Sequence, residues 1–367
     1  LTLPSMLFPG APMEPTEGRK FSLRKLLNIL LLSLIFSSFL FVSLHRSRLS
    51  DPQRPQPSVS PGPPPRATNA TLTILLWTWP FGSQPDSLAC PELPEPRGCL
   101  FTTNLSAWRG AAALVVHHRD ACGAPERLAR LPRLPTQRWL WLNMESPSHS
   151  PNLSAMNDLF NLTVSYRRDS DIFLPYGELR PLRRPRPLAV PRKSRLVAWV
   201  VSNWHEGSRR VTYYQELRKH IVVDVYGKGH EPLPREQLLP TLSRYCFYLA
   251  FENSQHEDYI TEKLWRNALA AGTVPVVLGP PRHNYERFLP PDSFIHVDDF
   301  GSAAELARYL WQLGWDPQRY RRHLRWRRWF RPVVGTGWAR RLCRVCHFLR
   351  SMPARYGTVP DLAAWFV

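Results

Sequence analysis

Acidic residues are scarce in this sequence. Its 367 residues include 29 Asp and Glu against 48 Lys and Arg, which gives a formal net charge of +19. Such an excess predicts an anionic partner, and nucleic acid, a membrane surface and a phosphorylated small molecule all meet that condition. A chain disordered as a whole is excluded, because 43% apolar and 21% charged residues are close to globular averages. No internal repeat is found, and the length predicts two domains.

Charge is absent from one long segment near the N-terminus. Residues 26–44 (LLNILLLSLIFSSFLFVSL) contain no charged side chain and are just long enough to cross a bilayer. More basic residues precede this segment than follow it, which favours a cytosolic N-terminus. A cleaved signal peptide is the alternative, but the apolar run is long for one and lacks a small-residue cleavage site. We predict a cytosolic tail at 1–25 and a transmembrane signal anchor at 26–44.

Sequons and cysteines are also absent before this segment. The four N-x-S/T sequons, at Asn69, Asn104, Asn152 and Asn161, all follow it. All six cysteines, from Cys90 onward, follow it too, as expected for an oxidising compartment. Both observations predict that the C-terminal part is lumenal.

The rest of the chain divides into a spacer and two sets of apolar runs. Residues 50–67 are rich in proline and have almost nothing to bury, so we predict an extended stem at 45–70. Apolar runs that read as buried strands and end in polar residues lie at 72–77, 112–118 and 138–146, and again at 196–203, 221–227, 247–253 and 274–279. Helical patterns lie between runs of the second set, at 209–220 and 261–272.

The alternation of strands and helices predicts an α/β protein with parallel sheets. A Pro/Arg-rich segment at 179–193 separates the two sets and reads as an interdomain linker. We therefore predict an N-terminal lobe at 71–190, a C-terminal lobe at 191–330 and a closing segment at 331–367 that packs back on the lobes. Ligands of such sheets bind beyond the carboxyl ends of the strands, where the polar residues stand.

One of these strand ends has an unusual continuation, FENSQHEDYITEK at 251–263. Thr261 is a plausible N-cap for the following helix, which places Glu262 and Lys263 in a first turn that favours an anion. Lys263 suits a phosphate, Glu262 can accept a hydrogen bond from a ribose hydroxyl, and the Asn253 amide can donate and accept. The alternative is a capped helix with an exposed lysine, and the residues alone leave both open.

A longer sequence around this stretch resembles a known family. FYLAFENSQHEDYITEKLWRNAL followed by GTVPVVLGPPRHNYERFLPPDSFIHVDDF resembles the donor-binding signature of the α1,3-fucosyltransferases. The similarity extends over most of residues 72–367, through LLWTWPF, HHRD, NMESPSHSP and VAWVVSNW. It implies a GT-B fold, in which two Rossmann-like lobes face each other across a cleft, with the acceptor lobe first and the GDP-fucose lobe second. It also implies a single-pass type II protein of the Golgi membrane.

The resemblance assigns roles to individual residues. Glu145 matches the proposed general base, and Arg210 and Lys263 match the cations that grip the diphosphate, for which the planar arginine fork is well suited. The implied nucleotide contacts are Tyr176, Ser202, Asn203, Arg210, Tyr248, Asn253, Tyr259, Glu262 and Lys263. The implied acceptor contacts are Trp77, His118 and Arg119, and Glu252 is expected to support the site. Cys90 and Cys99 are implied to pair with Cys343 and Cys346.

The implied reaction moves L-fucose, with inversion, from GDP-β-L-fucose to O3 of N-acetylglucosamine in galactosyl-β1,4-N-acetylglucosamine chains of glycoproteins and glycolipids. Arg119 stands where dual α1,3/α1,4 relatives carry Trp, which favours these type 2 chains over type 1 chains. A dual enzyme and an inactive Golgi sugar-binding protein remain alternatives. No cofactor is required, although manganese could stimulate release of GDP, and a homodimer is left open. Cys246 replaces a usual basic residue, so affinity for GDP-fucose could be lower.

Three other motifs suggest rival functions. The Asp-x-Asp at 169–171 mimics a manganese site, but the resemblance implies no metal in the chemical step, so we assign it a structural role. CRVCH at 343–347 matches a haem-attachment string and half a zinc site, and disulfide chemistry suits a lumenal domain better. Residues 319–331 interleave arginines and aromatics as single-strand nucleic-acid binders do. A lumenal domain meets no nucleic acid, so we predict that these aromatics pack.

Overall fold

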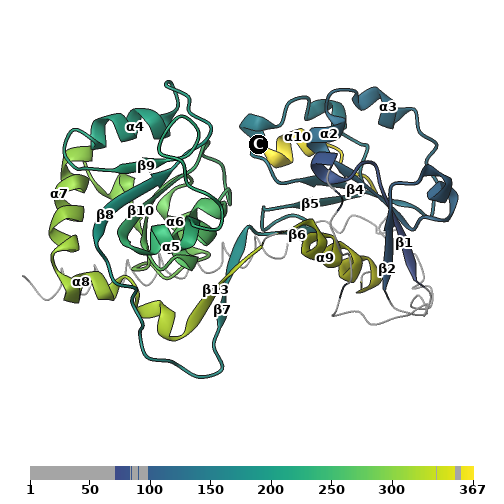
Figure 1. Ribbon diagram of the computed structural model, residues 1–367. Helices are drawn as coiled ribbons and strands as arrows, with labels where there is room; N and C mark the ends of the chain where they lie inside the picture. Colours follow the sequence, from purple (N-terminus) through teal and green to yellow (C-terminus); the bar gives the residue numbers. More distant parts are fainter. Residues whose placement is uncertain (1–70, 83, 85–89, 91–97, 336, 352–356) are drawn as a thin grey trace, which may run out of the picture. The chain divides into compact units, whose positions relative to one another are not determined.

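The computed structural model describes residues 71–367, apart from positions 83, 85–89, 91–97, 336 and 352–356 (Figure 1). The expected tail, anchor and stem therefore lie outside the described residues, as does the sequon at Asn69. Within the described part of the chain, no helix is both long and apolar enough to cross a membrane.

The first sheet has six parallel strands in the order β2-β1-β3-β4-β5-β6. They are β1 (Leu72–Leu76), β2 (Cys99–Thr102), β3 (Ala113–His117), β4 (Arg138–Asn143), β5 (Leu162–Ser165) and β6 (Ile172–Phe173). The expected strands at 72–77, 112–118 and 138–146 are confirmed as β1, β3 and β4, each ending before its last polar residues. Every residue of β3 is buried, as expected for a central strand of a parallel sheet.

The last part of the chain returns to this first sheet. Helices α9 (Trp338–Ser351) and α10 (Leu362–Phe366) contribute Leu342, Val345 and Phe366 to the core of the sheet. Two disulfides reinforce the return, Cys90–Cys343 and Cys99–Cys346, as the resemblance implies. The two remaining cysteines, Cys122 and Cys246, are free.

The second sheet has five parallel strands in the order β12-β11-β10-β8-β9. They are β8 (Arg195–Val200), β9 (Asp224–Tyr226), β10 (Tyr245–Phe251), β11 (Val274–Leu278) and β12 (Ile295–His296). The four strands expected in this region are confirmed as β8 to β11, with β9 three residues shorter at its start. All seven residues of β10 are buried, because helices cover both faces of the sheet.

Alternate residues of β10 enter two different cores. Phe247 and Phe251 pack with α4 (Arg209–Leu217) and α7 (Ala303–Gly314), whereas Tyr248 and Ala250 pack with α5 (Leu238–Ser243) and the π-helix η5 (Lys263–Ala270). Figure 1 shows α4 and α7 on one side of this sheet and α5 and α6 (Arg282–Glu286) on the other. This second unit is thus a sheet between two helical layers. The helices cover the faces of the sheet, and loops follow the carboxyl ends of its strands.

An antiparallel pair of strands connects the two units. Strand β7 (Gly177–Pro181) pairs with β13 (Phe330–Val334), so both passages of the chain between the sheets run side by side. A Cβ atom on Gly177 would lie 2.3 Å from Cγ of Trp265 in η5, so only glycine permits this approach.

The remaining elements are short. They are α2 (His118–Ala121), α3 (Pro125–Ala129), α8 (Pro317–Arg322), η1 (Pro80–Gly82), η2 (Leu105–Gly110), η3 (Pro147–His149), η4 (Ser154–Met156), η6 (Val297–Asp299) and η7 (Arg325–Arg328).

Candidate active site

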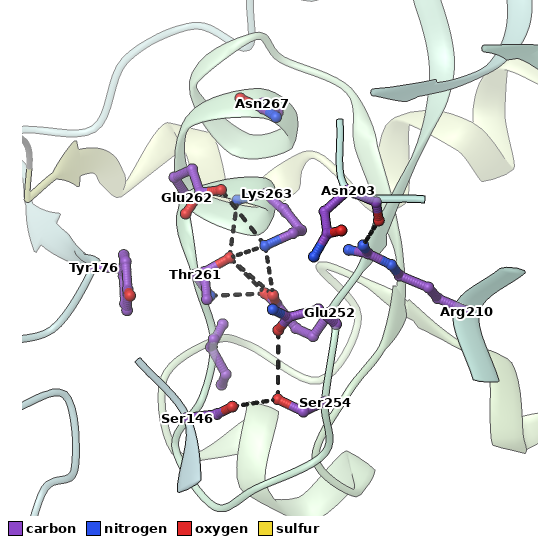
Figure 2. A network of polar contacts seen from close by, with 12 residues as sticks. Ser146, Tyr176, Asn203, Arg210, Glu252, Ser254, Thr261, Glu262, Lys263 and Asn267 are labelled. Atoms are coloured by element: carbon purple, nitrogen blue, oxygen red, sulfur yellow. Dashed lines mark hydrogen bonds and ion pairs between the residues drawn. The ribbon is translucent and has the colours of Figure 1, made fainter. Parts of the chain in front are cut away.

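Glu252 is the centre of a polar network at the carboxyl end of β10 (Figure 2). Its carboxylate is 2% exposed. Oε1 accepts hydrogen bonds from the backbone N–H of Thr261 at 2.8 Å and from its hydroxyl at 3.0 Å. Oε2 lies 3.0 Å from Nζ of Lys263. Glu252 thus contacts Lys263 directly and holds the segment before η5 against the end of the strand.

Lys263 is protonated in this network. Burial lowers the pKa of its ammonium group, but the neighbouring Glu252 and Glu262 carboxylates outweigh burial and leave that pKa raised. Burial would raise the pKa of Glu262, but Lys263 outweighs it and leaves the pKa lowered. The Glu262 carboxylate is 3.5 Å from Nζ and 37% exposed, whereas Lys263 is 16% exposed. The site thus offers a fixed cation and a reachable acceptor oxygen.

The start of the helix agrees in part with the expectation. Glu262 is the N-cap residue of η5, and its side chain makes no capping hydrogen bond. The Thr261 hydroxyl accepts from the backbone N–H of Lys263 at 3.5 Å, as a cap would, and it also donates to Glu252 and accepts from Nζ of Lys263 at 2.8 Å. The predicted end is confirmed, since Gly272 adopts φ +76° just past the C-cap Ala271.

Arg210 lies on the other side of this network from Tyr176 in Figure 2. It belongs to the first turn of α4 and is 5% exposed, and its Nη2 donates to the carbonyl of Asn203. Its Nε is buried without a hydrogen-bond partner, and burial lowers the pKa of the guanidinium. A buried donor with no acceptor is costly, so this group is prepared for an anionic ligand. Ser202 and the Asn203 side chain are exposed in the loop after β8.

The three tyrosines of the implied nucleotide site differ in access. Tyr176 is half-buried, and its hydroxyl donates to the carbonyl of Met144. Tyr259 is 3% exposed and packs against the Tyr176 ring with centroids 6.3 Å apart. Tyr248 is fully buried, and its hydroxyl accepts from Asn267 at 2.9 Å. The Tyr248 side chain thus belongs to the core beneath η5, and its contact with a nucleotide stays a prediction.

Glu145 lies where the loops of the two sheets touch. Ser254 Oγ donates to Oγ of Ser146 at 2.6 Å, and Asn253 is half-buried beside it. Glu145 is 26% exposed on its side chain, and its Oε1 is 4.0 Å from Nη1 of Arg119. Burial, followed by the Glu262 and Glu145 carboxylates, raises the pKa of Tyr176, so both carboxylates act on the same ring. Glu145 is thus brought close to the Lys263 network.

The acceptor residues implied in the first lobe are only partly accessible. Arg119 is 61% exposed on its side chain, and its guanidinium lies 5.4 Å from the Phe81 ring centroid. Trp77 follows β1 and is half-buried against the first core. His118 is 1% exposed, and its Nε2 donates to Pro151 O at 2.9 Å while Nδ1 accepts from the Trp141 indole at 3.2 Å. Both ring nitrogens of His118 have protein partners, and its contact with the acceptor stays a prediction.

The preceding residue, His117, was not among the predicted site residues. Its Nδ1 lies 2.8 Å from Oδ2 of Asp120, and its buried Nε2 has no partner. The Phe81 and Trp338 rings meet it edge-on at 4.9 and 5.4 Å. The spacing of three residues between His117 and Asp120 in HHRD was the available signal. The sequence does not tell which of the two histidines has a ring nitrogen left without a partner. That depends on where β3 ends, because neighbouring side chains point to different sides.

We expect the His118 arrangement to make stability fall at mildly acidic pH. Burial lowers the pKa of His118 from 6.5 to about 4, so the unfolded chain binds more protons between those values. Stability is therefore full above pH 6.5 and falls as pH drops toward 4, by up to about 3 kcal/mol. His118→Gln keeps a donor for Pro151 but does not titrate, so denaturant unfolding of both proteins at pH 7 and 5 should show a smaller loss for the variant. Equal losses would contradict this assignment.

The sequons and the Asp-x-Asp motif differ in their surroundings. Asn161 is 6% exposed, with Oδ1 accepting from Trp139 N at 2.8 Å and Nδ2 donating to Gly357 O, and a glycan at this sequon stays a prediction. Asn104 and Asn152 are exposed. In the Asp-x-Asp motif, Asp169 accepts from Arg167 at 2.8 Å and Asp171 accepts from Thr163 N at 2.8 Å. Both carboxylates thus serve protein donors, which supports the structural role.

Cys246 is remote from the network. It is the second residue of β10, at the amino end, whereas Glu252 follows the carboxyl end. Lys193 lies nearby, donating to the carbonyls of Ser243 and Gly272, and burial lowers its pKa to about 8. A basic residue at position 246 would therefore not reach a phosphate held by Lys263, and the expected loss of donor affinity has no structural basis.

Two family models match the chain. The model described as "Fucosyltransferase, N-terminal" matches residues 69–177, and "Glycosyltransferase family 10 (fucosyltransferase) C-term" matches residues 190–365.

Curated relatives carry names from the same family. The chain is 49% identical over 364 residues to human 4-galactosyl-N-acetylglucosaminide 3-alpha-L-fucosyltransferase FUT6, covering 98% of this chain and 99% of that one. It is 53% identical over 301 residues to FUT5 of Hylobates lar, covering 81% and 80%. It is also 50% identical over 349 residues to human 3-galactosyl-N-acetylglucosaminide 4-alpha-L-fucosyltransferase FUT3, covering 94% and 95%.

A solved structure shares the fold. The crystal structure of an alpha1,3-fucosyltransferase with GDP-fucose superposes with a TM-score of 0.52 over 82% of this chain and 95% of that one. At 16% sequence identity, this likeness concerns the fold alone.

Proposed function

Because the chain belongs to the fucosyltransferases of glycosyltransferase family 10, we propose that it transfers L-fucose from GDP-fucose to O3 of N-acetylglucosamine in type 2 glycans. The carrying observation is the contact between Ser146 and Ser254. It brings Glu145, a partly exposed carboxylate, to the edge of the second sheet where Arg210 and Lys263 stand at the starts of α4 and η5. Transfer from a sugar nucleotide needs a base for the acceptor hydroxyl and cations for the leaving diphosphate. The Ser146–Ser254 contact places one carboxylate and two cations on its two sides.

The proposed mechanism is one inverting displacement. Glu145 removes the proton from the acceptor hydroxyl as that oxygen bonds to the fucose anomeric carbon and the bond to GDP breaks. Negative charge then grows on the leaving diphosphate, where Arg210 and Lys263 stabilise it. The Glu252 carboxylate holds Lys263 in place, and Glu262 accepts a hydrogen bond from a nucleotide hydroxyl. No step assigned to these residues requires a metal ion.

We further propose that the two sheets form a GT-B pair that binds donor and acceptor on opposite sides. The supporting observation is that both sheets are parallel and that loops from their carboxyl ends meet. The apolar segment 26–44 and the sequons beyond it support a type II anchor in the Golgi membrane with a lumenal catalytic domain. The acceptors would then be glycoprotein and glycolipid chains in transit.

Acceptor choice is the sharpest test of this proposal. The full chain should release GDP from GDP-fucose when given a neutral or sialylated type 2 acceptor, and kcat/KM for type 1 acceptors should be at least about tenfold lower, a difference of roughly 1.4 kcal/mol. Arg119→Trp should narrow that ratio, because it replaces a charge beside Glu145 with an apolar surface. Activity should persist in EDTA.

Two outcomes would contradict it. Equal kcat/KM on type 1 and type 2 acceptors would favour the dual α1,3/α1,4 activity, which the name of the FUT3 relative makes the specific competitor. Failure to release GDP with any acceptor, in a protein that still binds the acceptor, would favour the sugar-binding alternative.

A further inference from the structure

A cluster of arginines far from the proposed reaction lines an open hollow of about 470 Å³. We call Arg321, Arg322, Arg325 and Arg328 the cationic face. Gln318 and Leu188 complete the lining. All four arginines are exposed, two at the end of α8 and two in η7.

The cationic face exists because its sequence alternates inward and outward residues. Tyr320, Leu324 and Trp326 are 5%, 1% and 5% exposed and enter the cores of the second sheet. Between them the arginines are left outside. The expectation that the aromatics of residues 319–331 pack is therefore confirmed for Trp326 but wrong for Trp329, which is 55% exposed directly after Arg328.

The charges of the cationic face are not neutralised by the protein. Among the described residues, no carboxylate lies within 4.0 Å of any of its four guanidinium groups. The nearest acidic side chain in sequence, Asp316, is occupied by the backbone N–H groups of Gln318 and Arg319. Four like charges around one hollow repel one another, so a polyanion that enters it relieves that repulsion.

A second arginine-rich segment joins the cationic face. The backbone N–H of Arg186 donates to Arg328 O at 3.0 Å, and that of Leu182 donates to Trp329 O at 2.7 Å. The linker that carries Arg183 and Arg184 therefore runs beside η7. Residues about 140 positions apart in the sequence thus form one basic region, which sequence reading alone treats as two.

The cationic face is separate from the proposed active site. Tyr320 OH donates to Cys246 O at the amino end of β10, whereas Glu252 follows the carboxyl end. A strand of seven residues is about 20 Å long, which separates the two regions. Substitutions in the cationic face should therefore leave transfer chemistry intact.

We propose that the cationic face binds a sulfated polysaccharide chain. The four clustered guanidinium groups place several positive charges within a short distance, which favours a sulfated chain, since it carries more anionic groups per sugar than a chain with carboxylates alone. The arginines lie along consecutive short helices around a concave surface, which fits a chain with repeated anionic groups better than a flat bilayer. The exposed Trp329 ring adds apolar contact area beside the charges. The proposal is independent of the proposed transfer reaction.

The test compares binding of a heparin decasaccharide to the full chain in a neutral detergent. A variant with Arg321→Ser, Arg322→Ser, Arg325→Ser and Arg328→Ser should bind at least about tenfold more weakly, and the slope of log K against log salt should fall by roughly 3. The matched control replaces Arg109, Arg127, Arg130 and Arg235 by Ser, which removes the same charge from exposed positions elsewhere. Its affinity should change less than about twofold.

Three outcomes would overturn the proposal. In the first, the fourfold variant and its control lose heparin affinity to the same degree. In the second, the unchanged protein binds a hyaluronan decasaccharide, which has carboxylates but no sulfates, as tightly as it binds heparin. In the third, the fourfold variant still binds heparin normally and loses binding only to mixed micelles that contain phosphatidylserine. If the fourfold variant does not fold, Arg322→Ser with Arg325→Ser should still weaken heparin binding about threefold. Fucosyl transfer to a small neutral acceptor should be unchanged in both variants, so a wrong transferase assignment would be recognised separately.

Discussion

Replacing Glu145 with glutamine is expected to lower kcat by at least about 100-fold, or roughly 2.7 kcal/mol of transition-state stabilisation. Glutamine keeps the shape of the side chain and its hydrogen bonding but cannot accept the acceptor proton. The affinity for GDP, measured by calorimetry, should stay nearly unchanged, because the proposed mechanism places the diphosphate on Arg210 and Lys263 of the other sheet. A loss in kcat without a loss in GDP binding is characteristic of a removed base.

The competing interpretation makes Glu145 only an ion-pair partner of Arg119, whose Nη1 lies 4.0 Å from its Oε1. Arg119→Gln is the matched control. If the ion pair were the whole role, both variants would lower the melting temperature to the same degree and leave turnover similar. We expect Arg119→Gln to change acceptor affinity and Glu145→Gln to change turnover. Near-normal kcat in Glu145→Gln would end the assignment of the base.

Replacing Lys263 with methionine should weaken binding of both GDP and GDP-fucose by about 10- to 100-fold, because a charged hydrogen bond to the diphosphate is worth roughly 1.5 to 3 kcal/mol. The same change should lower the free energy of unfolding by about 3 to 5 kcal/mol, since it leaves the buried Glu252 without its cation. Calorimetry and denaturant unfolding measure the two effects separately.

A double variant separates binding from stability. In Lys263→Met combined with Glu252→Gln, the Thr261 N–H and hydroxyl still have an oxygen acceptor, and no charge is buried alone. Most of the lost stability should return, whereas GDP binding should stay weak. If GDP binding returned together with stability, Lys263 would be a structural partner of Glu252 and not a diphosphate ligand.

The sequence predicted the frame of the fold because its signal is local. The apolar runs of β8, β10 and β11 are continuous, which is the pattern of strands buried on both faces, and those of β8 and β10 end in polar residues. Strands β2, β5, β6 and β12 and the ribbon of β7 and β13 were missed. They have at most five residues each, too few for a clear pattern, and β7 and β13 depend on each other across about 150 residues of chain.

The site residues also divide into those that local sequence identifies and those that depend on the folded structure. Lys263 and Glu252 could be singled out because polar residues after an apolar strand require a reason. The burial of His118, Tyr248 and Asn161 could not be predicted, because a motif gives a residue's identity but not the direction of its side chain. All three point into the core, where their polar atoms have protein partners. At Thr261 one hydroxyl serves both the buried Glu252 carboxylate, to which it donates, and the helix start, where it accepts from the N–H of Lys263.

The return of α9 and α10 to the first sheet has a consequence for biosynthesis. Leu342, Val345 and Phe366 complete a core whose strands were made some 200 residues earlier. The second sheet and its helices lie wholly within that interval, so they can fold while the ribosome is still working. The first lobe must wait, with part of its apolar surface uncovered, until the last residues emerge. Truncation near the C-terminus should therefore damage the first half of the protein and spare the second.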